Sequence, residues 1–95
     1  MSDNILDNKA VILENPSQMR RCIKRCYECG MLHRKAPSQD LTYPCYMMVT
    51  FLGDNNYMIE LNKDGCNSNE SVLEKGYCPI TINQFKDITK EIFNV

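Results

Sequence analysis

Thiol and imidazole groups recur at regular intervals in the first half of the chain. Cys22, Cys26, Cys29 and His33 follow one another at spacings of four, three and four residues. These residue types bind zinc, and they also act as nucleophile and base in thiol enzymes. The same spacing is that of one face of an α-helix, where reduced cysteines are common small core residues. The pattern leaves two interpretations open, a buried helix face and a chemical site.

Zinc binding requires the helix to end inside this pattern. On an unbroken helix the first and last of the four residues would lie about 16 Å apart, at about 1.5 Å per residue. If the helix ends at Gly30, Cys26 and Cys29 form a CxxC pair that His33 and Cys45 could complete. This Cys3His set resembles a zinc knuckle, although a knuckle places its last two ligands closer together. The alternative is that the helical cysteines belong to the core and that no metal is bound.

A thiol enzyme is a further interpretation of Cys29 and His33. The two lie four residues apart, and His33 is the only histidine of the chain. Such a pair needs a third group that orients the base and a site for an oxyanion, and the sequence offers neither. A redox dithiol is disfavoured because the CxxC pair would lie near the helix C-terminus, where the helix dipole does not stabilise a thiolate. We therefore predict that the protein is not an enzyme.

Most of the positive charge lies in the same segment. Residues 15–39 contain six cations and one anion, whereas the rest of the chain contains five cations and eleven anions. The six cations, which we predict as partner-binding residues, are Arg20, Arg21, Lys24, Arg25, Arg34 and Lys35. On a helix the first four would cover the solvent side. They would attract either an acidic or mixed protein surface or a nucleic acid backbone. The alternative is a solvated helix face with no binding role.

Two helices are predicted, at about residues 16–30 and 82–94. Asn15 can cap the first, and Gly30 suits the left-handed position after its end. Thr81 begins a capping box at the start of the second, whose apolar residues recur at helical spacing.

Three strands are predicted, with a fourth as an optional edge strand. Residues 41–52 are apolar on both faces, so this strand should be central and covered on both sides. A turn of glycine, aspartate and asparagine leads from it into a second strand, which gives an antiparallel hairpin. The four segments are residues 9–14, 41–52, 57–61 and 71–78, and residues 62–71 are expected to form a surface loop.

These elements predict one α+β domain over residues 1–95. It should be a two-layer sandwich of order β-α-β-β-(β)-α with a mostly antiparallel sheet, and residues 1–8 should be flexible. The chain shows no signal peptide and no apolar run long enough to cross a bilayer, so we expect a cytoplasmic protein that does not contact membranes. In that compartment the six cysteines should be reduced, although zinc ligation and disulfides remain open.

The function that fits these features best is that of a small non-enzymatic binding or regulatory protein without a cofactor. It would act by stoichiometric contact with a macromolecule. Its size and its many residues with AT-rich codons suit an accessory inhibitor of a virus or phage. The alternative is a nucleic-acid-binding domain with one structural zinc, built on Cys26, Cys29, His33, Cys45 and the basic helix face.

Overall fold

The computed structural model describes residues 5–33, 42–54, 56–61 and 68–94. In these residues the elements follow the order β1 (Lys9–Leu13), α1 (Pro16–Glu28), β2 (Leu32–His33), β3 (Cys45–Gly53), β4 (Asn56–Leu61), α2 (Asn69–Glu74), β5 (Cys78–Ile80) and α3 (Ile82–Phe93).

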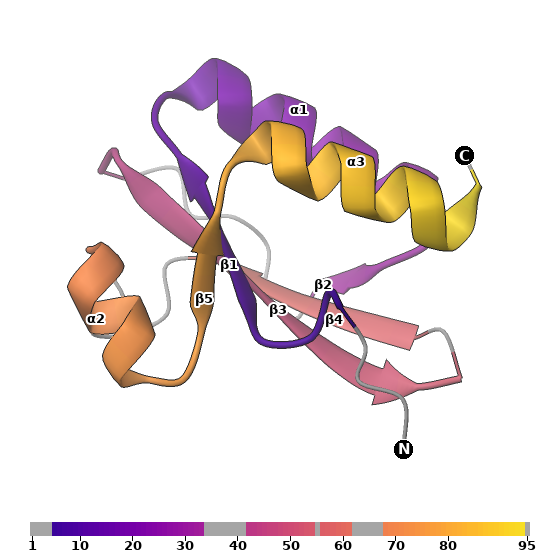
Figure 1. The fold of residues 1–95 in the computed structure, drawn as a ribbon. Helices are drawn as coiled ribbons and strands as arrows, with labels where there is room; N and C mark the ends of the chain where they lie inside the picture. Colours follow the sequence, from indigo (N-terminus) through magenta and orange to yellow (C-terminus); the bar gives the residue numbers. More distant parts are fainter. Residues whose placement is uncertain (1–4, 34–41, 55, 62–67, 95) are drawn as a thin grey trace.

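The strands form one mixed sheet of order β2-β4-β3-β1-β5. The long central ladders, β1 with β3 and β3 with β4, are antiparallel, while the short outer ladders, β1 with β5 and β2 with β4, are parallel. Helices α1 and α3 lie side by side on one face of the sheet, and α2 lies on the other face (Figure 1). The predicted small α+β domain with a mostly antiparallel sheet is confirmed.

Strand β3 is buried on both faces over its first half, as its apolar pattern predicts. Cys45, Met47 and Val49 belong to the larger core, which also contains the buried side of α1 and Phe85 of α3. Tyr46 and Met48 belong to a smaller core on the opposite face. Because two apolar faces can be buried only between two layers, β3 occupies a central place in the sheet.

Helix α1 begins and ends as its capping residues predict. The side chain of Asn15 caps its start, with β-region backbone dihedrals. At its end, the amide of Gly30 donates to the Tyr27 carbonyl (3.1 Å) and the amide of Met31 donates to the Cys26 carbonyl (3.0 Å). Gly30 has a φ of +72°, and this pair of hydrogen bonds is the Schellman motif. The chain therefore turns away from the helix directly after Cys29, the residue that follows α1.

Helix α3 begins with the predicted capping box. The Thr81 hydroxyl accepts a hydrogen bond from the Gln84 amide (3.1 Å), and the Gln84 side chain accepts one from the Thr81 amide (2.8 Å). Phe85 is fully buried, and Ile88 and Ile92 pack against the same core. The apolar stripe of this helix thus covers the sheet beside α1.

The segment before β5 differs from the prediction of a loop followed by an edge strand over residues 71–78. A short helix, α2, is present instead, and the hydroxyls of Ser68 and Ser71 form the capping box that begins it. Val72 is fully buried against the smaller core. One buried side chain in six residues gives no periodicity that could distinguish a helix from a strand. The strand that does follow, β5, is short and pairs in parallel with β1.

The described part of the N-terminal segment is packed against the sheet, although we expected residues 1–8 to be flexible. Leu6 is fully buried. The side chain of Asp7 accepts a hydrogen bond from the Phe51 amide (2.9 Å), and the amide of Asn8 donates to the Val49 carbonyl (3.0 Å). Two adjacent apolar residues, Ile5 and Leu6, among polar neighbours do not predict such packing. Residues 1–4 lie outside the described residues.

Candidate functional site

A groove of about 230 Å³ lies between α1 and α3, and most of its charged side chains are cations. Four cations line it, Arg21, Lys24 and Arg25 from α1 and Lys86 from α3, together with a single anion, Glu28. Phe85 is also part of the lining. A cleft in which one sign of charge dominates concentrates ions of the opposite sign. The groove is therefore suited to bind an anionic group.

Short connections from two parallel strands place the two helices beside one another. Strand β1 leads into α1 and β5 leads into α3 after one or two residues. Because β1 and β5 pair in parallel, α1 and α3 run in the same direction across the sheet (Figure 1). Arg21, Lys24, Arg25 and Glu28 recur at three- and four-residue spacing, so they form one stripe of α1 that faces the first turns of α3.

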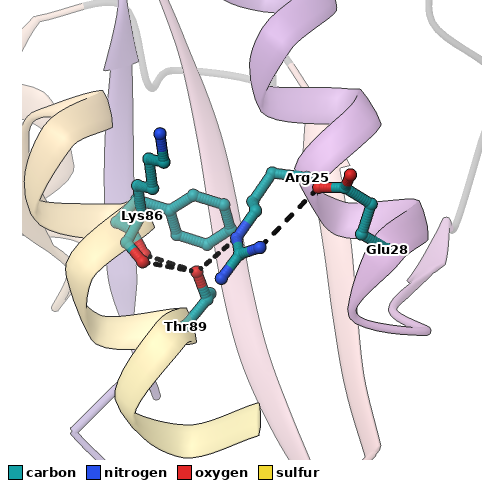
Figure 2. A network of polar contacts seen from close by, with 5 residues as sticks. Arg25, Glu28, Lys86 and Thr89 are labelled. Atoms are coloured by element: carbon teal, nitrogen blue, oxygen red, sulfur yellow. Dashed lines mark hydrogen bonds and ion pairs between the residues drawn. The ribbon is translucent and has the colours of Figure 1, made fainter. Parts of the chain in front are cut away.

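Arg25 is held between the two helices by Thr89. The guanidinium Nε donates a hydrogen bond of 2.9 Å to the Thr89 hydroxyl, and Nη1 lies 3.7 Å from a carboxylate oxygen of Glu28 (Figure 2). The Thr89 hydroxyl in turn donates to the carbonyls of Phe85 and Lys86, both at 2.9 Å. Only 13% of the Arg25 side chain is exposed. The groove thus contains one cation whose position is fixed.

The other cations of the groove are less constrained. Arg21, Lys24 and Lys86 are exposed. Within the described residues, the Arg25–Glu28 contact is the only ion pair that involves the groove. These three side chains therefore have no acidic partner in the described part of the chain. An anion that enters the groove would therefore not compete with a described acidic side chain for Arg21, Lys24 or Lys86.

The predicted partner-binding residues have different locations. Arg21, Lys24 and Arg25 line the groove, and Arg20 is exposed on α1 outside the groove lining. Arg34 and Lys35 lie outside the described residues. Arg25 was expected on the solvent side, and that placement is wrong. Its position borders the apolar stripe of α1 and faces α3, where a buried hydroxyl offers the acceptor that a charged group needs when it leaves water.

Sequence reasoning missed the contribution of α3 to this site. Neither Lys86 nor Thr89 was among the predicted partner-binding residues. Thr89 is fully buried, and among the described residues it is the only polar or charged residue that is buried. Its position four residues after Phe85, on the apolar stripe of α3, is the signal that could have identified it.

The cysteines of the predicted zinc set are distributed through the core. Cys26 and Cys45 are buried in the larger core, and Cys29 lies half-buried just after α1. The backbone of His33 belongs to β2, but its side chain lies outside the described residues. Across the described residues, no three side chains of histidine, cysteine, aspartate or glutamate form a group that could hold a metal ion. The structure therefore gives this Cys3His set no support.

Cys29 has the environment of an ordinary thiol rather than that of an activated nucleophile. Burial raises the pKa of Cys29, and the Arg25 guanidinium and a hydrogen bond with Thr89 oppose this effect without cancelling it. Reactive cysteines have a lowered pKa, because the thiolate is the attacking form. The absence of enzymatic activity stays a prediction, and this geometry lends no support to a thiol enzyme.

Comparisons with known proteins add no information about the function of the chain. No protein-family model matches the chain, and neither a curated protein nor a solved structure shows significant similarity to it. Within the described residues, no helix has the length and apolar character that crossing a membrane would need.

Proposed function

We propose that the protein is a small, non-enzymatic binding module that acts by stoichiometric contact with another protein. Its groove between α1 and α3 would take an acidic side chain of that partner, and the exposed cations around it would contact neighbouring acidic residues. The observation that carries the proposal is the composition of the groove, in which Arg21, Lys24, Arg25 and Lys86 face a single anion. A regulator or inhibitor works by such contact.

The size and chemistry of the groove favour a protein over a nucleic acid. A volume of about 230 Å³ accommodates one side chain, whereas a nucleic acid backbone needs cations along a continuous track. The formal net charge of the chain is −1 and its pI is about 5.7, whereas dedicated nucleic-acid-binding domains are usually basic overall. Ile82, which is half-buried and also lines the groove, adds an apolar contact that suits the aliphatic part of a glutamate side chain.

The fixed position of Arg25 strengthens this proposal. Binding normally costs the conformational freedom of each long side chain that becomes ordered, about 0.5–1.5 kcal/mol for each one. The hydrogen bond to Thr89 has already ordered Arg25. An acidic group that enters the groove therefore meets one cation that loses little further freedom, inside a site that is partly shielded from water.

An NMR titration tests the proposal directly. The isotope-labelled protein is titrated with a peptide that alternates glutamate and leucine and, separately, with a single-stranded oligonucleotide. We expect the peptide to shift the backbone amide signals of Arg21, Lys24, Asn83 and Lys86, and we expect the shifts to weaken as salt is added. Tighter binding of the oligonucleotide at the same amides would instead favour the nucleic acid alternative.

Matched charge reversals give the control. Arg21→Glu with Lys24→Glu changes the groove, while Lys75→Glu with Lys90→Glu makes the same change of net charge at exposed cations outside it. The groove variant should bind the peptide at least about tenfold more weakly, and the control should bind nearly as well as the wild type. Equal losses in the two variants would show that only net charge matters and would reject the groove as the site.

The cytoplasmic location stays a prediction.

A further inference from the structure

Three sulfur atoms meet in the core beneath α1. The thiol sulfurs of Cys22 and Cys26 each lie 3.6 Å from the thioether sulfur of Met47, which is the acceptor in both contacts. The two thiols also share a hydrogen bond with each other. All three residues are fully buried. Each sulfur atom therefore has the other two as neighbours, and the three form a closed triangle.

The secondary structure explains why these atoms converge. Cys22 and Cys26 lie one helical turn apart on the buried face of α1, so their side chains emerge side by side. Met47 lies on the face of β3 that points toward the same core, and its pairing with β1 fixes its position. The triangle is thus built from two regular elements rather than from a loop, as a rigid ligand site requires.

The two sides of the triangle that end at Met47 fit a three-coordinate site for a soft metal ion. Three sulfur ligands at about 2.3 Å from one ion, arranged in a plane around it, lie about 4 Å from one another. The contacts of 3.6 Å to Met47 are only a few tenths of an ångström shorter. Thiolate and thioether ligands select Cu(I) over harder ions. We propose that Cys22, Cys26 and Met47 form a buried binding site for one Cu(I) ion.

Cys29 and Arg25 provide an access route and a compensating charge. Cys29 is the half-buried cysteine at the end of α1, and it lies close enough to Cys26 for the two thiols to interact electrostatically. It can therefore receive the ion near the surface and pass it inward. The hydrogen bond with Cys22 and burial raise the pKa of Cys26, while the nearby Arg25 guanidinium lowers it. Arg25 would likewise offset the charge of the loaded site.

The binding step balances without a redox partner. One Cu(I) ion binds, the Cys22 and Cys26 thiols each release a proton to solvent, and the Met47 thioether donates a lone pair without losing a proton. The loaded site then carries one negative charge. The copper stays Cu(I) throughout, and no sulfur atom is oxidised. Zinc is a poorer fit, because it prefers four ligands and rarely accepts a thioether.

Competition with a chromogenic chelator under anaerobic conditions tests the site. The reduced protein is titrated with Cu(I) in the presence of bicinchoninate, which forms a coloured Cu(I) complex. We expect the wild type to withhold one Cu(I) per chain from the chelator. Met47→Leu keeps the volume and apolar character of the side chain, so the fold should persist. It removes one ligand, and the affinity for Cu(I) should fall by about tenfold or more.

The same strand offers a matched control. Met48 is also buried, but it belongs to the smaller core on the opposite face of β3. Met48→Leu should therefore leave Cu(I) affinity unchanged, and Cys26→Ala should abolish the bound equivalent. Far-UV circular dichroism of each variant verifies the fold. Equal Cu(I) affinities in the wild type, Met47→Leu and Cys26→Ala would overturn the proposal, as would the absence of any Cu(I) withheld by the wild type.

X-ray absorption of the copper-loaded wild type gives a second measurement that needs no variant. Three sulfur atoms in the first coordination shell are expected. A shell that contains nitrogen or oxygen, or one with only two sulfur atoms, would contradict the assignment of Met47 and both cysteines as ligands. Stoichiometric Zn(II) binding of equal strength at the same residues would also contradict it.

Discussion

The Nε atom of Arg25 on α1 donates a hydrogen bond of 2.9 Å to the hydroxyl of Thr89 on α3. This contact joins the two long helices. It satisfies a charged group that is mostly removed from water, and it gives the only buried polar residue of the described chain a partner outside its own helix. The same contact therefore serves the stability of the fold and the geometry of the groove.

Thr89→Val is expected to destabilise the protein although it conserves the shape of the side chain. The change leaves Arg25 Nε without its acceptor in a largely buried position, at a cost of about 1–2 kcal/mol. In a domain of this size Tm falls by about 4–8 °C for each kcal/mol. Urea unfolding measures the free energy, and Thr89→Ser, which keeps the hydroxyl, should recover most of it. Wild-type stability in Thr89→Val would show that the hydrogen bond contributes nothing.

Val72→Ala should destabilise the protein more than its short helix suggests. Val72 is the fully buried residue of α2, and it packs in the smaller core with Ala10, Tyr46 and Met48. Loss of two buried methyl groups should cost about 1–2 kcal/mol. Leu73, with 59% of its surface exposed, gives the neighbouring control, and Leu73→Ala should change the free energy of unfolding by less than about 0.5 kcal/mol. Similar losses for both variants would contradict the packing of α2 on the sheet.

Residues that cap helices or alternate along a strand could be interpreted from the sequence. Asn15, Gly30 and Thr81 act locally, because each satisfies backbone groups a few residues away, and their helices begin and end as predicted. The two apolar faces of β3 likewise indicated its central position. These features depend on short-range geometry that the order of residues already contains.

The missed features depend on contacts between distant segments. The partly buried position of Arg25 follows from Thr89, which is 64 residues away. Helix α2 has one buried residue and too few turns for a periodic pattern, and β2 consists of two residues paired at the sheet edge. The sulfur triangle requires Met47 beneath α1, and that position depends on how β3 packs against the helix. Of these relationships, only the place of Thr89 on the apolar stripe of α3 leaves a periodic trace in the sequence.

Alkylation of Cys29 should be slow at neutral pH. Its rate should still be rising at pH values where a thiol with an unperturbed pKa is already fully ionised. Its raised pKa keeps the thiol protonated at pH 8, so iodoacetamide should modify it more slowly in the folded protein than in the chain unfolded by urea. Peptide mapping by mass spectrometry follows this residue alone. Because the Glu28 carboxylate contributes to the raised pKa, Glu28→Gln should lower the pKa and increase the rate modestly. Faster modification in the folded protein would instead indicate an activated nucleophile.

The buried thiols should make the fold less stable in alkali. The hydrogen bond with Cys22 and burial raise the pKa of Cys26, and burial followed by the influence of Cys22 raises that of Cys45. A thiol whose pKa is higher in the folded state favours folding fully below its unfolded pKa, about 8.5, and this contribution is lost as pH rises further. Urea unfolding at a series of pH values should therefore show stability falling from about pH 8.5 upward.

Cys45→Ala separates this titration from simple loss of packing. At pH 7 the variant should be less stable than the wild type, because it removes a buried sulfur atom. The difference between the two proteins should shrink as pH rises above about 8.5, because only the wild type then loses the contribution of the Cys45 thiol. A difference that stays constant across this range would show that Cys45 has the same pKa in the folded and unfolded chains, and that its burial contributes only through packing.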